Sequence, residues 1–307
     1  MRLLQAGVLA LWLTCAGAQA GTTPTEQASG ENVLTMRVDG ELTIGTQGEV
    51  EAYALRTELT PDLQKMLDKA IPKWAFVPIE QDGKPVRAKT PMRITLAARE
   101  VGEKKYEVKI DNVVFVPLTK EDRDAAEAAE RAAGKAVASL NRLQSHLYPK
   151  YPNELLAAGV EGIALLRLRV NSDGSVADVF AEQSSLYNVK GSPRVLDKAR
   201  ALLVKSAMGA ARKWTFSVEN ASPEQRQNIE VRVPVEYSLK EPDEARRYAE
   251  GTGVWRYEYR GPRLDPTWKK TEDMELVVGV SDLNSGEMVS GSTPFRLRDR
   301  SVLNQAL

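Results

Sequence analysis

The most regular feature of the chain is the alternation of apolar and polar residues over Ile229–Leu239. A period of two predicts a β-strand with one buried face and one solvated face. Pro234 stands within this pattern, and it cannot donate a hydrogen bond to a neighbouring strand. We therefore expect the strand at or near the edge of a sheet. The apolar positions are Ile229, Val231, Val233, Val235, Tyr237 and Leu239, and the polar positions are Glu230, Arg232, Glu236 and Ser238.

Three further elements precede this strand. Alternation over Ala164–Val170, an Asp-Gly turn within Asn171–Gly174 and the following segment Val176–Ala181 predict a hairpin. Apolar residues recur at helical spacing over Ser192–Ala211, which begins with a favourable Ser-Pro pair. A Lys-Trp-Thr-Phe motif at 213–216 follows the helix. The second half of the chain is therefore predicted to be a β-β-α-β unit.

The first half of the chain shows the same order of elements. Leu42–Gly45 and Glu49–Leu55 flank a Thr-Gln-Gly turn, and a short helix with an apolar face begins at Thr60-Pro61. A Lys-Trp-Ala-Phe motif at 73–76 and an alternating strand over Met92–Leu96 come next. The shared order and the K-W-x-F motif predict an internal repeat. The alternative is that two small α+β patterns arose independently.

Other segments frame these two units. Tyr106–Phe115 is expected to add a strand to the first unit, and Thr119–Leu147 is rich in alanine and mixed charge, which favours a helical spacer. The tail has an aromatic strand pattern at Trp255–Tyr259 and a second candidate strand at Glu275–Val280, and we expect disorder from Ser281 onwards. The fold class is therefore α+β, with two small modules joined by a helical spacer and followed by a partly disordered tail. The predicted organisation is a flexible lead at 21–32, modules at 33–118 and 148–240, a linker at 119–147 and a tail at 241–307.

The first twenty residues have the pattern of a secretory leader. One positive charge, Arg2, precedes an apolar run that ends in Ala18-Gln19-Ala20, a site typical of signal-peptidase cleavage. Cleavage after Ala20 predicts a mature periplasmic chain without cysteine, because Cys15 lies in the leader. The alternative is an uncleaved inner-membrane anchor, for which the uncharged stretch Leu3–Ala20 is at the short limit.

Composition narrows the chemistry that the chain can perform. Its 307 residues include 42 basic and 42 acidic side chains, and zero net charge argues against a general nucleic-acid-binding surface. The single cysteine, Cys15, and the single histidine, His146, argue against an internal disulfide framework and a Cys/His zinc site. We expect no enzymatic activity, no metal and no cofactor. His146 is interpreted as a surface or packing residue, and Trp74 and Trp214 as core residues rather than ligand-groove residues.

The second unit resembles the C-terminal domain of TonB, the periplasmic energy-transducer family. Motifs at defined spacings over residues 148–240 carry the resemblance, whereas 33–98 resembles a degraded copy without the Tyr-Pro lead. The motifs are Tyr151-Pro152, Glu161-Gly162, Asp173-Gly174-x-Val176, Arg212-Lys213-Trp214-x-Phe216 and Val231-x-Val233-Pro234-Val235-x-Tyr237.

The resemblance implies that the second module captures an extended periplasmic segment of an outer-membrane transporter, which adds as a strand to the sheet. The strand implied to receive the partner comprises Ile229, Glu230, Val231, Arg232, Val233, Val235, Glu236 and Tyr237. The family-motif residues expected to hold the fold are Tyr151, Pro152, Gly162, Asp173, Gly174, Trp214, Phe216 and Pro234.

Two features depart from the family pattern. The leader is predicted to be cleaved rather than kept as an anchor, and Thr119–Leu147 is not the long Pro-rich spacer of the family. A binding or adaptor role is therefore a safer expectation than energy transduction. The alternative is an envelope structural protein whose duplicated modules pair with each other or with the cell wall. A homodimer is a further possible arrangement of the chain.

Overall fold

The structure is a computed structural model that describes residues 29–303, except 82, 104, 119, 133–138, 143–147, 220–228, 240–252, 269–275 and 291–293. The predicted leader and His146 lie outside the described residues. None of the described helices combines the length and the apolar character needed to cross a membrane.

The chain alternates strands with a few helices. The strands are β1 (Glu31–Ile44), β2 (Val50–Leu55), β3 (Ile79–Gln81), β4 (Lys84–Val86), β5 (Ala88–Gly102), β6 (Lys105–Val114), β7 (Ser139–Arg142), β8 (Glu161–Val170), β9 (Val176–Tyr187), β10 (Phe216–Glu219), β11 (Ile229–Tyr237), β12 (Arg256–Arg260) and β13 (Val289–Ser290). The helices are α1 (Pro61–Ala70), α2 (Lys120–Ala132), α3 (Asn153–Ala157) and α4 (Pro193–Ala211), and short 3-10 turns are η1 (Ile71–Lys73), η2 (Val280–Asp282) and η3 (Arg300–Val302). The mixed α+β class expected from the sequence is confirmed.

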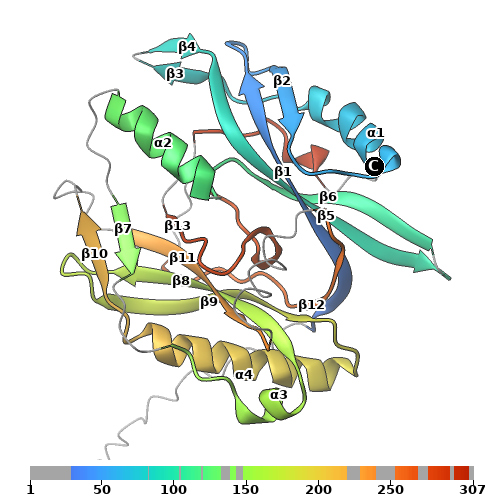
Figure 1. The fold of residues 1–307 in the computed structure, drawn as a ribbon, viewed down its shortest axis with the longest axis vertical. Helices are drawn as coiled ribbons and strands as arrows, with labels where there is room; N and C mark the ends of the chain where they lie inside the picture. Colours follow the sequence, from blue (N-terminus) through green and yellow to red (C-terminus); the bar gives the residue numbers. More distant parts are fainter. Residues whose placement is uncertain are drawn as a thin grey trace, which may run out of the picture.

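Nine of the described strands form one antiparallel sheet. Its order is β13-β11-β8-β9-β12-β1-β5-β6, and β2 also pairs with β1. The predicted hairpins correspond to β1–β2 and β8–β9, and the predicted helices to α1 and α4, each of which has proline in its first turn. In Figure 1, α1 and α4 lie at opposite ends of the molecule, each with its own group of strands.

Each group of strands has its own apolar core. Leu203 of α4 and Trp214 pack with β8 and β11 in one core, while Leu67 of α1 and Trp74 pack with β1 and β5 in another. Both tryptophans are buried, which confirms that they are core residues. The two groups of strands form one sheet because β12 pairs with β9 on one side and with β1 on the other.

The two units share a turn geometry. Gly48 and Gly174 both have a φ of +85°, a left-handed conformation that favours glycine. The N–H of Phe76 donates to Gly48 O at 2.7 Å, and that of Phe216 donates to Gly174 O at 2.8 Å. A Cβ atom would lie 2.0 Å from Phe76 O at the first glycine and 1.9 Å from Phe216 O at the second. The same backbone hydrogen bond, from the phenylalanine of the K-W-x-F motif to the glycine of the hairpin turn, therefore occurs in each unit.

Two boundaries differ from the sequence-based expectation. β1 already begins at Glu31, within the predicted flexible lead. The predicted spacer forms the helix Lys120–Ala132, but Ser139–Arg142 is a strand that pairs with β10 after the Trp214 motif. The expectation of a helix throughout is wrong there because pairing with a strand distant in sequence outweighs local propensity.

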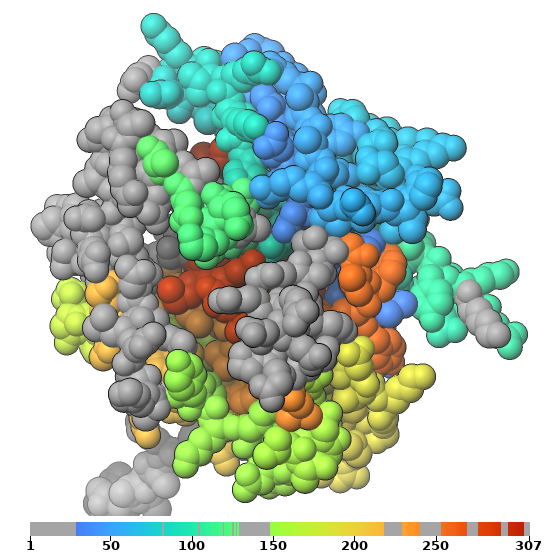
Figure 2. Space-filling model, in the orientation of Figure 1, coloured from blue at the N-terminus to red at the C-terminus, as the bar shows by residue number. Residues whose placement is uncertain are grey.

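The described tail is part of the fold. The aromatic pattern at 255–259 corresponds to β12, but Leu276–Gly279 contains no strand, and Ser281–Asn284 are buried rather than disordered. Apolar tail residues form a third core with Val114 of β6 and Leu165 of β8, which explains their order; these tail residues are Leu276, Val278, Val280, Leu283 and Val289. Figure 2 shows a stretch of red tail atoms between the green atoms of α2 and the second unit.

Candidate functional site

β11, the predicted docking strand, is the last long strand at its side of the sheet. It pairs with β8 along its whole length, from Ile229 opposite Val170 to Tyr237 opposite Gly162. On its other side, β13 stands opposite only Val231 and Arg232. Among the described residues, no strand pairs with the outer edge of Val233–Tyr237. The outer edge of β11 is therefore covered by β13 at Val231 and Arg232, and no described strand pairs with it at Val233–Tyr237.

The polar face of β11 is buried at its centre, whereas the sequence pattern predicts a solvated face. Its apolar side chains pack in the α4 core, and Arg232 on the other face is only 5% exposed. Arg232 donates to the fully buried Glu182 of β9, with Nε–Oε2 and Nη2–Oε1 distances of 2.7 and 3.1 Å. Arg167 of β8 donates to Glu230 at 2.6 Å and to Glu182 at 3.4 Å. The prediction of a solvated polar face is wrong at Arg232, which other parts of the chain cover, whereas Glu230 and Glu236 remain partly exposed.

The Tyr-Pro motif braces the end of β11. Tyr151 donates its hydroxyl to Val160 O at 2.6 Å and packs edge-to-face on Tyr237, with ring centroids 5.4 Å apart. Burial, with the charge of Glu161, raises the pKa of Tyr151 to about 12. Pro152 caps the start of α3 and Gly162 stands opposite Tyr237. These motif residues therefore meet at one end of the strand.

The remaining motif residues are structural. Asp173 accepts hydrogen bonds from Ser175 N at 2.9 Å and Ser175 Oγ at 2.6 Å, and these bonds lower its pKa. Trp214 and Phe216 are each 2% exposed in the α4 core. This part of the motif holds the hairpin against the helix and does not present side chains to a ligand.

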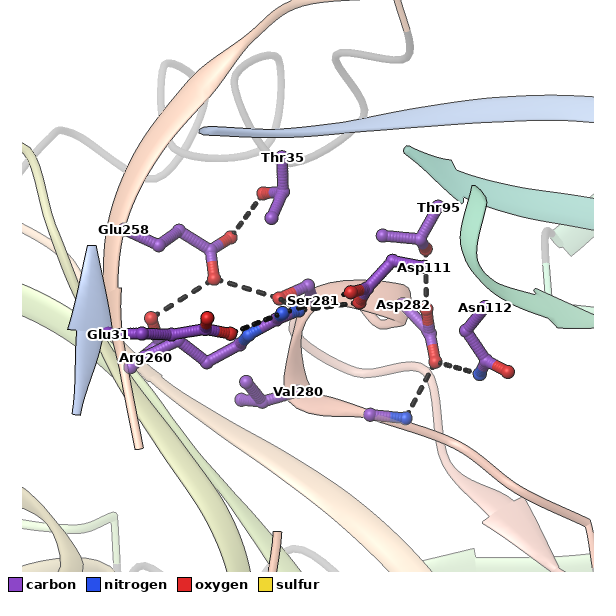
Figure 3. A network of polar contacts seen from close by, with 12 residues as sticks. Glu31, Thr35, Thr95, Asp111, Asn112, Glu258, Arg260, Val280, Ser281 and Asp282 are labelled. Atoms are coloured by element: carbon purple, nitrogen blue, oxygen red, sulfur yellow. Dashed lines mark hydrogen bonds and ion pairs between the residues drawn. The ribbon is translucent and has the colours of Figure 1, made fainter. Parts of the chain in front are cut away.

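Buried charged and polar side chains continue from β11 across the sheet to the first unit. We call the part around η2 the polar junction; it comprises Thr35, Arg37, Asp39, Arg93, Thr95, Asn112, Arg256, Glu258, Ser281, Asp282, Asn284 and Glu287. Figure 3 shows how strands of the first unit and β12 direct such side chains towards Ser281 and Asp282. No group of three His, Cys, Asp or Glu residues able to hold a metal occurs in the described part of the chain.

Glu258 of β12 is the anionic centre on one side of the polar junction. Its fully buried carboxylate accepts hydrogen bonds from Thr35 Oγ1 at 2.6 Å, Ser281 Oγ at 2.8 Å and Arg256 Nη2 at 2.6 Å. Burial alone would raise the pKa of Glu258, but the charge of Arg256 and these donors outweigh it and lower the pKa to about 2. Glu258 is therefore ionised and fixes Ser281 of the tail against both units.

Asp282 is held differently, by neutral donors. Its Oδ2 accepts from Asn112 Nδ2 and from Gly279 N, both at 2.6 Å, and its Oδ1 contacts Thr95 Oγ1. Burial, with a smaller contribution from Asp111, raises the pKa of Asp282 above its ordinary value of 3.8. Two N–H donors converge on Oδ2, so a proton on this carboxyl sits on Oδ1 and is donated to Thr95.

Asp282→Asn should stabilise the chain at neutral pH, by about 1–3 kcal/mol. The amide reproduces the protonated carboxyl: its oxygen accepts from Asn112 and Gly279, and its NH₂ donates to Thr95. A raised folded-state pKa means that the parent loses stability as pH rises above 3.8, whereas the variant does not. Urea denaturation at pH 4 and pH 7.5 should therefore show a gain that grows with pH. A loss of stability at both pH values would contradict this account.

Sequence reasoning missed the polar junction. Arg93 and Glu258 of the polar junction occupy polar positions of strands, where the sequence pattern indicates solvent. The segment that covers these side chains comes from the tail, which is far away in the sequence. The residues next to the covered positions give no indication of it. The sequence pattern therefore predicts that Arg93 is exposed, although its side chain is only 3% exposed in the structure.

Comparison with known proteins gives one similarity. No family model matches the chain, and no solved structure matches it. The chain is similar to protein TonB from two strains of Xanthomonas campestris pv. campestris, with 38% identity over 91 residues in each case. The match covers 30% of this chain and 34% of each relative, so the chain spans about a third of the length of the curated relatives it matches. The chain therefore contains a TonB-like segment within a mixed α+β fold.

Proposed function

We propose that the chain is a periplasmic protein-binding protein. Its second unit would capture an extended segment of an outer-membrane transporter, or of another envelope protein, by adding that segment as a strand beside β11. The observation that carries the proposal is the position of β11, whose outer edge at Val233–Tyr237 pairs with no described strand. Backbone groups of an edge supply affinity in this mode of recognition. The similarity to TonB supports the same mode.

We further infer that the two units are copies of one module. The shared glycine turn is accompanied by matching bonds at the tryptophans, Trp74 N to Ile71 O and Trp214 N to Ala211 O, both at 3.1 Å. Strand order also corresponds, because β13-β11-β8-β9 in one unit matches β6-β5-β1-β2 in the other. In the first unit β6 pairs with β5 from Arg93 to Gly102, so most of that β5 edge is covered by a long strand. The second unit is therefore the better candidate for the docking site.

One observation favours a structural role as the alternative. β12 joins the two units into a single sheet, and a buried ion pair between Arg93 and Glu287 holds the tail against the first unit. Such an arrangement suits an envelope protein whose modules pair with each other and take no part in energy transduction. Capture of transporter peptides at β11 would favour the binding role, and absence of capture would favour the structural role.

Glu236→Pro should weaken peptide capture, whereas Glu236→Thr should not. The β8 ladder runs through Pro234 without a register shift, so we place the N–H-lacking side of Pro234, and by alternation the N–H of Glu236, on the outer edge. Proline removes that donor and threonine keeps it, while both remove the glutamate side chain. Loss of one hydrogen bond predicts about a two- to tenfold higher Kd.

The measurement is calorimetric titration with synthetic peptides covering the periplasmic segments of outer-membrane transporters. Circular dichroism and urea denaturation would show that both variants remain folded. Arg232→Pro is unsuitable for this purpose, because it would also break the buried pair with Glu182. Equal affinity of the two folded variants, or no binding to the parent, would overturn the proposed docking edge.

A further inference from the structure

We propose that β13 is an internal competitor for the docking edge: Val289 and Ser290 occupy the place beside Val231 and Arg232 that a partner strand would take. This inference rests on the proposed function, and it concerns the regulation of that site. The position is defined by the register, in which Val231 stands opposite Ser290 and Arg232 opposite Val289. A partner that pairs along the whole of β11 must therefore displace β13.

The ladder between β13 and β11 is short. It joins two residues of each strand, whereas β6 covers the corresponding β5 edge from Arg93 to Gly102. Segments with few backbone pairs open locally at a lower free energy than long central strands. Most of the β5 edge is therefore covered by a long strand, whereas the β11 edge is covered only by the two-residue strand β13, which we expect to open more easily.

Side chains of the first unit hold the segment that leads into β13. Arg93 of β5, oriented by Asp39 at 2.6 Å, donates to Glu287 at 2.6 Å just before β13. The N–H of Asn284 donates to the same carboxylate at 2.7 Å, and Asn284 in turn contacts Arg37 of β1. We call Asn284–Ser290 the latch. It connects the first unit to the edge of the second.

The apolar contacts of the latch are limited to its end. Val289 is buried beside Leu165 and Val280 in the third core, and Met288 packs partly buried against the α4 core. Opening of the latch exposes these two side chains and breaks the pair between Arg93 and Glu287. Affinity for a partner is then reduced by the fraction of molecules whose edge is open.

A disulfide across the ladder tests this directly. Val231 and Ser290 are opposite in register, and opposite residues of antiparallel strands come close to the separation that a disulfide requires. The variant Val231→Cys/Ser290→Cys, made with Cys15→Ser, should lock the latch when oxidised and free it when reduced. Oxidised protein should bind the transporter peptides of the preceding section at least about tenfold more weakly than reduced protein. The two single-cysteine variants, treated in the same way, should bind equally in both redox states.

Glu287→Gln should change peptide affinity in the opposite direction to the disulfide. It weakens the clamp from Arg93, so it should increase peptide affinity, and hydrogen exchange at 284–290 should become faster than in the parent. The matched control is Glu51→Gln, which removes a carboxylate from a surface pair with Arg87. This control should change neither the peptide affinity nor the rate of hydrogen exchange at 284–290.

The possible outcomes separate the inference from the proposed function. Equal peptide binding by the oxidised and reduced forms would overturn the latch and leave the docking edge standing. Exchange at 284–290 as slow as in β8 would also overturn it, because the latch would then be a permanent strand. Fast exchange without binding of any peptide would overturn the proposed function, and with it a regulatory role for the latch.

Discussion

Glu182→Gln should lower the free energy of unfolding by about 3–5 kcal/mol. Glu182 is fully buried and receives Arg232 and Arg167, whose side chains are 6% and 9% exposed. Glutamine keeps the shape of the side chain but removes the negative charge that faces the buried Arg232 guanidinium. Loss of one member of a buried pair is costly because the other cannot regain its hydration. Urea denaturation followed by circular dichroism measures the change.

The control for this substitution lies on the same strand. Asp178→Asn breaks the pair with Arg169, in which the side chains are 41% and 46% exposed. Exposed pairs contribute at most about 1 kcal/mol, because water and salt screen them. Similar losses for the two variants would show that the polar face of β9 is hydrated, and would contradict the burial of Arg232 and Glu182.

Short-range signals in the sequence were sufficient to locate the individual elements. The Asp-Gly turn at 171–174, the Ser-Pro helix start at 192–193 and the alternation over Ile229–Tyr237 each depend on neighbours within a few residues. The geometry of such turns and caps is set locally, which is why these predictions are confirmed. The same signals located the docking strand proposed for the second unit.

Long-range pairing could not be predicted in the same way. β12 pairs with strands far from it in sequence, and nothing in its composition specifies that it joins two units. The burial of Arg232 likewise depends on other strands and on a tail that follows it by about fifty residues. β13 is too short to show any periodicity, so its position on β11 had no sequence signal. These contacts decide whether the docking edge is open, and they come from tertiary structure alone.

Trp214→Ala should destabilise the chain by about 3–5 kcal/mol. Trp214 is 2% exposed and packs in the α4 core with Leu203 and Val233. Alanine leaves a cavity that the surrounding strands and α4 can fill only in part. A residue lining a ligand groove would behave differently: stability would change little while peptide capture decreased. Denaturation and peptide titration on the same variant distinguish the two roles.

Trp74→Ala is the matched variant in the first unit, and the pair of substitutions tests whether the sheet unfolds as one body. Trp74 is also 2% exposed, and its ring packs edge-to-face on Phe115 with centroids 6.4 Å apart. Since β12 pairs with both units and the third core contains residues of both, we expect either substitution to shift a single cooperative transition. Transitions monitored by circular dichroism and by fluorescence of the remaining tryptophans should coincide. If each substitution lowered only one of two separate transitions, the units would be independent domains, and a latch held from the first unit could not control the edge of the second.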